Sequence, residues 1–174
     1  MVYTFKMMET FTYSWNQMAT AYWHRYPNPY SENVLSEDTI ERYIDKDGKL
    51  VTKRLLCKKG SVPRWASMLI RARLCFVVEE SIVDPINKIF TTRKRNLEWQ
   101  SVVSVVEEVI YRQCVENKAW TIAERRALVD SKALSILGSV QSFTKKSFKE
   151  GWLKSSKGYQ AILSAMYPNG TSRS

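Results

Sequence analysis

The side chains that most often carry enzymatic chemistry are few and scattered in this sequence. There is one histidine, His24, and any Ser-His-Asp or Cys-His arrangement would have to use it. Two pairs of neighbouring carboxylates, Glu79 with Glu80 and Glu107 with Glu108, occur in stretches typical of strands. Successive side chains of a strand point to opposite faces, so the members of a pair are poorly placed to act together. We therefore expect a protein that is not an enzyme, with His24 at the surface or capping a helix.

Metal and cofactor sites are not indicated either. The stretch from Asp45 to Gly48 lacks the remaining ligands of a calcium loop, and the sequence has no glycine-rich phosphate loop. The cysteines lie far apart without a Cys-x-x-Cys motif, which favours free, buried thiols over a disulfide framework or a zinc site. They are Cys57, Cys75 and Cys114. We expect no bound metal and no cofactor.

The chain is strongly basic, with 27 Lys and Arg against 17 Asp and Glu in 174 residues and a formal net charge of +10. A field of this sign favours an anionic partner: nucleic acid, an acidic membrane surface or a phosphate-bearing ligand. No apolar run approaches the roughly 20 residues needed to cross a bilayer, so we expect a soluble or peripheral protein. Residues 1–15 resemble neither a transit peptide nor a signal peptide.

Apolar periodicity and turn residues predict an α+β fold. Ser14 and Gln17 have the spacing of a capping box and Pro27 disfavours helix just before it, so a first helix runs from Ser14 to near Tyr26. Alternating runs predict seven strands, at 2–12, 34–44, 50–57, 73–83, 88–99, 102–113 and 120–130, and a long last helix covers 134–166. This order predicts a meandering antiparallel sheet that curls around a helix and can enclose a cavity. We expect one domain over 1–168 and a short tail, 169–174.

The central part of one face of the predicted long helix has small and basic residues where large apolar ones are expected. A line of small and basic residues (Ser147, Gly151, Lys154 and Gly158) interrupts the apolar residues on either side. A helix that only covers a core keeps large side chains along its buried face. Two interpretations remain: the small residues let the helix approach a sheet closely while Lys154 reaches solvent, or they leave space for a ligand beside an ammonium group.

Nucleic-acid binding is the main alternative that composition suggests. Basic and aromatic side chains adjoin at Arg64 with Trp65 and within 149–152, and six tryptophans could stack on bases. Most aromatic residues, however, fall at expected core positions, and no recognised RNA- or DNA-binding motif is present. A module that only docks on acidic membranes is a third possibility.

Several short motifs, taken in order, are more specific. The heptapeptide 25–31 (RYPNPYS) places two prolines after the first helix and holds Arg25 at the helix end, where a cation is favourable. Further motifs follow at 45–50 (DKDGKL), 54–56 (RLL), 63–65 (PRW), 81–85 (SIVDP) and 154–158 (KSSKG). With this series the chain resembles, over essentially its whole length, the PRELI family of mitochondrial phospholipid transfer proteins. At positions 25 and 30, with Arg25 and Tyr30, the chain resembles the branch of the family that carries phosphatidic acid.

The resemblance implies a fold, a cargo and a partner. Family members have a curved seven-stranded antiparallel sheet wrapped around a long helix, with a cavity like that of START-type lipid-transfer domains. They carry phosphatidic acid between the outer and inner mitochondrial membranes, which supports cardiolipin synthesis. They do so bound to a small twin CX9C helical-hairpin protein. We therefore expect a lipid carrier of the intermembrane space that acts peripherally at acidic membranes and binds no nucleic acid.

The resemblance also implies a lipid site. The expected phosphate-binding residues are Arg25, Lys58, Lys154 and Lys149, and the expected small lining residues are Ser147, Gly151 and Gly158. The first three cations match the family's pattern. Lys149 is included because it lies near Ser147, where relatives commonly have a basic residue. On this basis we expect Arg25→Glu to abolish phosphatidic acid transfer while leaving the fold intact.

Residues 58–71 correspond to the family's lid, a loop over the cavity mouth. Apolar side chains there are flanked by Lys and Arg, a pattern suited to an acidic bilayer. The residues expected to insert are Val62, Pro63, Trp65, Met68 and Leu69. The alternative is a short helix packed on the core.

Overall fold

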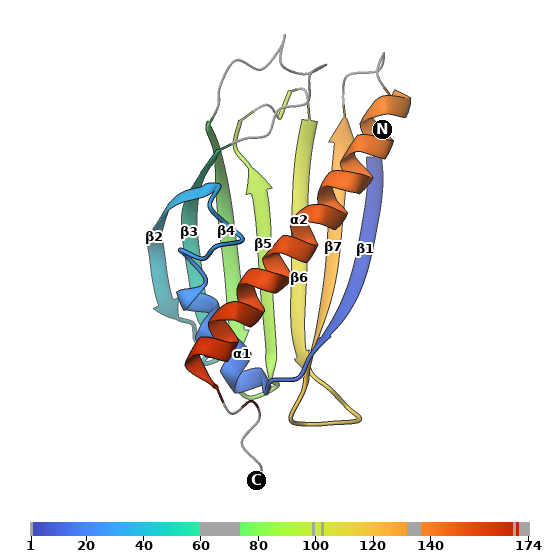
Figure 1. The fold of residues 1–174 in the computed structure, drawn as a ribbon. Coiled ribbons are helices and arrows are strands. Elements are labelled where there is room, and N and C mark those ends of the chain that lie inside the picture. Colours follow the sequence, from blue (N-terminus) through green and yellow to red (C-terminus); the bar gives the residue numbers. More distant parts are fainter. Residues whose placement is uncertain are drawn as a thin grey trace.

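The computed structural model describes residues 2–59, 74–98, 100–101, 103–131, 137–168 and 170, with side chains described except at 131 and 137–144. Seven strands form one antiparallel sheet in the order β1-β7-β6-β5-β4-β3-β2 (Figure 1). The strands are β1 (Val2–Phe11), β2 (Val34–Ile44), β3 (Leu50–Lys59), β4 (Leu74–Asp84), β5 (Ile89–Asn96), β6 (Val103–Gln113) and β7 (Thr121–Ser131). The helices are α1 (Trp15–Ala21), the short 3-10 helix η1 (Tyr22–His24) and α2 (Leu137–Met166). The predicted fold class is confirmed.

The first helix forms for the reason its sequence indicates. The Ser14 hydroxyl accepts a hydrogen bond from the backbone N–H of Gln17 at 3.3 Å, and the Gln17 side chain accepts one from the N–H of Ser14 at 2.9 Å. This reciprocal pair is the predicted capping box. Helical geometry then continues through η1 to Arg25, two residues before Pro27.

The strand boundaries largely agree with the prediction, and the one clear difference has a local cause. β5 ends at Asn96 because that side chain closes the turn to β6. Its amide group donates to the carbonyls of Glu98 at 2.6 Å and Val103 at 3.0 Å, and its oxygen accepts the N–H of Val105 at 2.8 Å. Most of the predicted lid segment 58–71, the first residue of the strand predicted at 73–83, residues 134–136 of the predicted last helix and most of the predicted tail lie outside the described residues.

α2 crosses the concave face of the sheet diagonally, and α1 packs against it at one end (Figure 1). Aromatic side chains fill that end: the ring centroid of Tyr22 lies 4.6 Å from that of Phe90 and 6.1 Å from that of Tyr159. The core cluster is Phe11, Trp15, Met18, Ala21, Tyr22, Phe90, Val109, Tyr111, Ala123, Tyr159 and Leu163. Because this core occupies only one end, space remains between α2 and the sheet further along.

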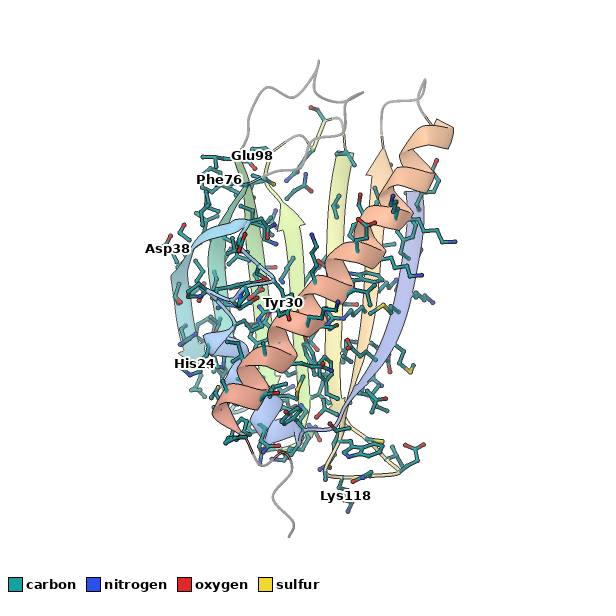
Figure 2. The ribbon with its side chains drawn as sticks, in the orientation of Figure 1. His24, Tyr30, Asp38, Phe76, Glu98 and Lys118 are labelled. Carbon is teal, nitrogen blue, oxygen red and sulfur yellow. The ribbon has the colours of Figure 1, made fainter. Side chains whose placement is uncertain are left out.

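Other sequence-based expectations concern the polar side chains. The three cysteines are free, as predicted, but only Cys114 is buried; the other two are partly buried. His24 is exposed on the outside of the molecule (Figure 2). Within the described ranges, no three His, Cys, Asp or Glu side chains gather where they could hold a metal ion. No helix in the same part of the chain is both long and apolar enough to cross a membrane.

Candidate functional site

A cavity of about 730 Å³ lies between α2 and the concave face of the sheet. The loop after η1 closes one side of it, and Tyr30, labelled in Figure 2, lines it from that loop. Apolar walls are provided by Pro29, Val34, Val109, Tyr111, Phe148 and Trp152. The charged lining residues are Arg25, Lys58, Lys59, Lys94, Arg125 and Lys154, with Glu32, Glu107 and Glu150. The described lining therefore carries an excess of three positive charges beside apolar walls.

A row of alternating charges crosses the concave face beneath this space. Arg54 on β3 pairs in register with Glu79 on β4, which pairs with Lys94 on β5, which pairs with Glu107 on β6. Residues directly opposite each other in an antiparallel sheet share a face, so the four side chains lie side by side. Arg54 Nε is 3.0 Å from Glu79 Oε1, and Lys94 Nζ is 3.3 Å from Glu79 Oε2. On α2, the indole N–H of Trp152 donates to Glu107 at the end of this row.

Arg25 reaches the same row from the end of η1. Its Nε donates to the carbonyl of Tyr22 at 3.2 Å, and its NH2 group is 3.2 Å from Glu79 Oε2. The guanidinium carbon lies 3.6 Å from the centroid of the Tyr22 ring, and the residue is only 4% exposed. Arg25 thus both satisfies a carbonyl at the helix end and lines the cavity, in a fixed position.

The electrostatics of the row centre on Glu79, which is fully buried. Burial opposes ionisation of a carboxyl, yet the charges of Lys94, Arg25 and Arg54 hold the pKa of Glu79 well below its usual range. Burial likewise opposes the charge of Lys94, but Tyr26 and Glu79 raise the pKa of its ammonium group. The carboxylate and its three cations are therefore charged together.

A second buried guanidinium lines the cavity from β7. Arg125 is 4% exposed, and its NH2 group lies 3.6 Å from Glu9 Oε2 and 3.4 Å from Ser156 Oγ on α2. Ser156 also donates a hydrogen bond to Glu9. Arg125 Nε is buried and has no hydrogen-bond partner among the described residues. Cationic groups therefore line the cavity at two parts of the sheet, near β3–β5 and near β7.

The structure brings together three of the four predicted phosphate-binding residues. Arg25, Lys58 and Lys154 all line the cavity, although Lys58 is half-buried on β3 and Lys154 is largely exposed on α2. In the described part of the chain, neither lysine makes an ion pair with a carboxylate. Lys149 is exposed on α2 and does not line the cavity, so its predicted place in the phosphate site is not supported.

The predicted small face of α2 divides into two parts. Ser147 and Gly151 line the cavity, and a Cβ added at Gly151 would meet no atom within 4 Å. At Gly158 an added Cβ would lie 2.6 Å from Oδ1 of Asn28, so this glycine lets α2 pack closely on the loop after η1. Gly158 is therefore a packing residue and not part of the lining, which corrects the prediction. The close approach at Gly158 is to this loop and not to the sheet, and a ligand in the space beside Ser147 and Gly151 stays a prediction.

The predicted lid residues, Val62, Pro63, Trp65, Met68 and Leu69, lie outside the described residues. Their insertion into a bilayer stays a prediction, as does the alternative of a helix packed on the core.

The residues that sequence reasoning missed are mainly the interior charges of the sheet: Arg54, Glu79, Lys94, Glu107 and Arg125. In the sequence, Glu79 and Glu107 stand out only as members of carboxylate pairs with their neighbours. The pairing of Asp84 with Ile89 across the predicted turn at 84–87 also places Glu79 opposite Lys94. Counting outward from that turn would have found this pair, because side-chain register in a hairpin is fixed by its loop.

These features define a class of protein, in which an antiparallel sheet wraps around a C-terminal helix in the START-like fold. The protein TTHA0849 from Thermus thermophilus has a TM-score of 0.63 and 13% identity to this chain, over 95% of this chain and 99% of its own. The Zhui aromatase/cyclase from Streptomyces sp. R1128 has a TM-score of 0.59 and 10% identity, over 98% and 99%. At such identities the likeness shows the fold alone.

Sequence comparison gives the family. A model described as the PRELI-like family matches residues 16–168. "PRELI domain-containing protein 1, mitochondrial" from Gallus gallus is 39% identical over 162 residues, which cover 91% of this chain and 75% of the relative. "Protein UPS1, mitochondrial" from Saccharomyces cerevisiae is 34% identical over 165 residues, 94% of each chain. The chain therefore belongs to the PRELI-like family, and the resemblance found in its sequence is confirmed.

Proposed function

We propose that this protein is a mitochondrial lipid carrier that extracts phosphatidic acid from one membrane and delivers it to another. The observation that carries the proposal is the cavity of about 730 Å³, which combines apolar walls with an excess of basic side chains. A carrier of an anionic lipid needs both features in one space.

The apolar walls would offset the larger energetic cost, which is that of removing the acyl chains from the bilayer. Removing a two-chain lipid from a bilayer exposes on the order of thirty methylenes at about 0.8 kcal/mol each, roughly 24 kcal/mol in total. A flat apolar patch covers only one side of a chain and cannot offset this cost. Val109 and Tyr111 on the sheet face Phe148 and Trp152 on α2 across the same cavity, which supplies opposed apolar surfaces.

The basic side chains would meet the second requirement, which is to give the head-group phosphate cationic partners outside water. A phosphomonoester carries between one and two negative charges and cannot be removed from water without partners. Lys58, Lys59 and Lys154 are the lining cations without an ion pair among the described residues, so they are the best placed to neutralise it. Arg25 and Lys94 are already held by Glu79. They contribute hydrogen-bond donors in fixed positions more than free charge.

Family membership supports a more detailed setting. We propose that transfer takes place in the intermembrane space, between the outer and inner mitochondrial membranes, and supports cardiolipin synthesis. We further propose that the protein acts as a heterodimer with a small twin CX9C helical-hairpin protein and uses residues 62–69 at the membrane. The relatives' names contain the word "mitochondrial", which supports the organelle.

The test is lipid extraction with identification of the cargo. Protein purified with its partner is mixed with liposomes that contain phosphatidic acid, the liposomes are removed, and the lipid left with the protein is identified by mass spectrometry. We expect phosphatidic acid in stoichiometric amount. Binding to acidic liposomes without extracted lipid would instead identify a docking module. Steeply salt-dependent affinity for RNA or DNA, again without extraction, would identify a nucleic-acid binder.

A further inference from the structure

Tyr26 occupies a position in the cavity that the proposed phosphate site does not yet use. It follows Arg25 directly, and its side chain lines the same cavity as Lys58 and Lys94. The guanidinium carbon of Arg25 lies 5.1 Å from the centroid of the Tyr26 ring. A phenol is thus placed among the cations that would hold an anionic head group.

Charged groups from four parts of the fold act on the Tyr26 phenol, and Lys154 on α2 lines the same cavity. Arg25 approaches from η1, Lys58 from β3, Glu79 from β4 and Lys94 from β5. Glu79 is itself engaged by Arg25 and Lys94, so the remaining field at the phenol is positive. Burial opposes ionisation of the phenol, but Arg25, Lys94 and Lys58 outweigh it and lower the pKa of Tyr26 to about 8.

We propose that the Tyr26 hydroxyl is a ligand of the head-group phosphate, donating a hydrogen bond when neutral and excluding the anion when ionised. This inference rests on the proposed function and adds a residue to its binding site. A neutral phenol is a hydrogen-bond donor, whereas a phenolate is only an acceptor. Once ionised, it both repels the phosphate and neutralises the cations that would attract it.

The expected size follows from linkage. If only the neutral form of Tyr26 admits the anion, affinity falls about tenfold for each pH unit above the ionisation of the phenol. Between about pH 7 and about pH 9.5 the loss is about thirtyfold. Below about pH 7 the phenol is neutral and has no effect on the pH profile.

The experiment is a calorimetric titration with a short-chain, water-soluble phosphatidic acid at several pH values. Wild type, Tyr26→Phe and Tyr30→Phe are compared, because Tyr30 lines the same cavity and serves as the matched control. Dividing the affinity of wild type by that of Tyr26→Phe cancels the ionisation of the probe and of the lysines. We expect this ratio to fall about thirtyfold over the range, and the ratio of wild type to Tyr30→Phe to stay constant.

A direct readout accompanies the titration. At about pH 9 the probe should reduce phenolate absorbance in wild type and in Tyr30→Phe, because binding requires the neutral phenol, and should leave Tyr26→Phe unchanged. Tight binding by all three proteins with a constant wild type to Tyr26→Phe ratio would overturn the role of Tyr26 and leave the carrier function standing. No binding by wild type at about pH 7 would overturn the carrier function and this inference with it.

Discussion

Replacing Glu79 with Gln tests the buried charge cluster that underlies the site. The carboxylate is fully buried and pairs with Arg25 at 3.2 Å, with Lys94 at 3.3 Å and with Arg54. Glutamine keeps the shape but removes the charge, so three cations lose their shared partner. Breaking a buried ion pair costs about 3–5 kcal/mol, and with three partners we expect the upper part of that range. For a domain of this size the loss lowers Tm by about 8–20 °C.

The pH dependence of this loss is the sharper test. The pKa of Glu79 is lowered in the folded protein, whereas in the unfolded chain it is about 4.3. A carboxyl of this kind contributes stability that is fully present above its unfolded pKa and is lost as the pH falls toward its folded pKa. The difference in unfolding free energy between wild type and Glu79→Gln should therefore be constant from about pH 7 to about pH 5 and shrink below about pH 4.

Urea unfolding at a series of pH values measures this difference, and Glu80→Gln is the matched control. Glu80 is the next residue, but its side chain is 46% exposed and pairs with Lys53 at 3.6 Å on the outer face. Surface pairs contribute about 0–1 kcal/mol, so this control should stay close to wild type. A loss below about 1 kcal/mol for Glu79→Gln, or a loss that does not change between neutral and strongly acid pH, would refute the reasoning.

Two further pairs of variants separate binding from packing along α2. Lys154→Glu should reduce phosphatidic acid extraction at least tenfold, because it places a negative charge at the cavity. The control Lys157→Glu, which is also exposed on α2, should not reduce extraction. Equal losses for the two variants in a liposome extraction assay would remove Lys154 from the site. Gly158→Ala should destabilise the fold by about 1–3 kcal/mol in thermal unfolding, because its Cβ would meet the Asn28 side chain. Gly151→Ala should stabilise the helix by about 0.5–1 kcal/mol, since its Cβ meets nothing, and a destabilising effect there would contradict the described space.

The expectation that Arg25→Glu leaves the fold intact does not agree with the surroundings of Arg25. The residue is 4% exposed and bonded to Glu79 and to the carbonyl of Tyr22. A glutamate there would bury a second carboxylate beside Glu79, and we now expect loss of stability together with loss of transfer. The helix-end position of Arg25 was visible in the sequence, but its carboxylate partner comes from a strand 54 positions away.

Local signals explain why the elements could be predicted. The capping box of Ser14 and Gln17 and the turn at Asp45–Gly48, where Gly48 has a φ of 77°, depend on neighbouring residues. The charge row could not be seen in the same way, because it joins residues from four strands. Each pair of neighbouring strands gives one step of the row, and the site becomes visible only when the three steps are combined with α2 and η1. The same holds for Gly158, whose partner Asn28 lies in a distant loop.

The carboxylates inside the cavity bear on how a carrier can both accept and release an anion. If the buried cations had no internal partners, a bound phosphate would be held by the whole set, and the empty cavity would be unstable through mutual repulsion. The residues that line the cavity carry an excess of three positive charges, a count that leaves out Glu79 and Glu9. Glu79 pairs with Arg25 and Lys94, and Glu9 pairs with Arg125, so including these two carboxylates lowers the excess from three to one; Arg54 and Glu37 offset each other. A head group with one or two negative charges roughly balances this remaining excess, so in the proposed carrier the internal carboxylates match the site to a single phosphate and keep it from being held by every cation at once.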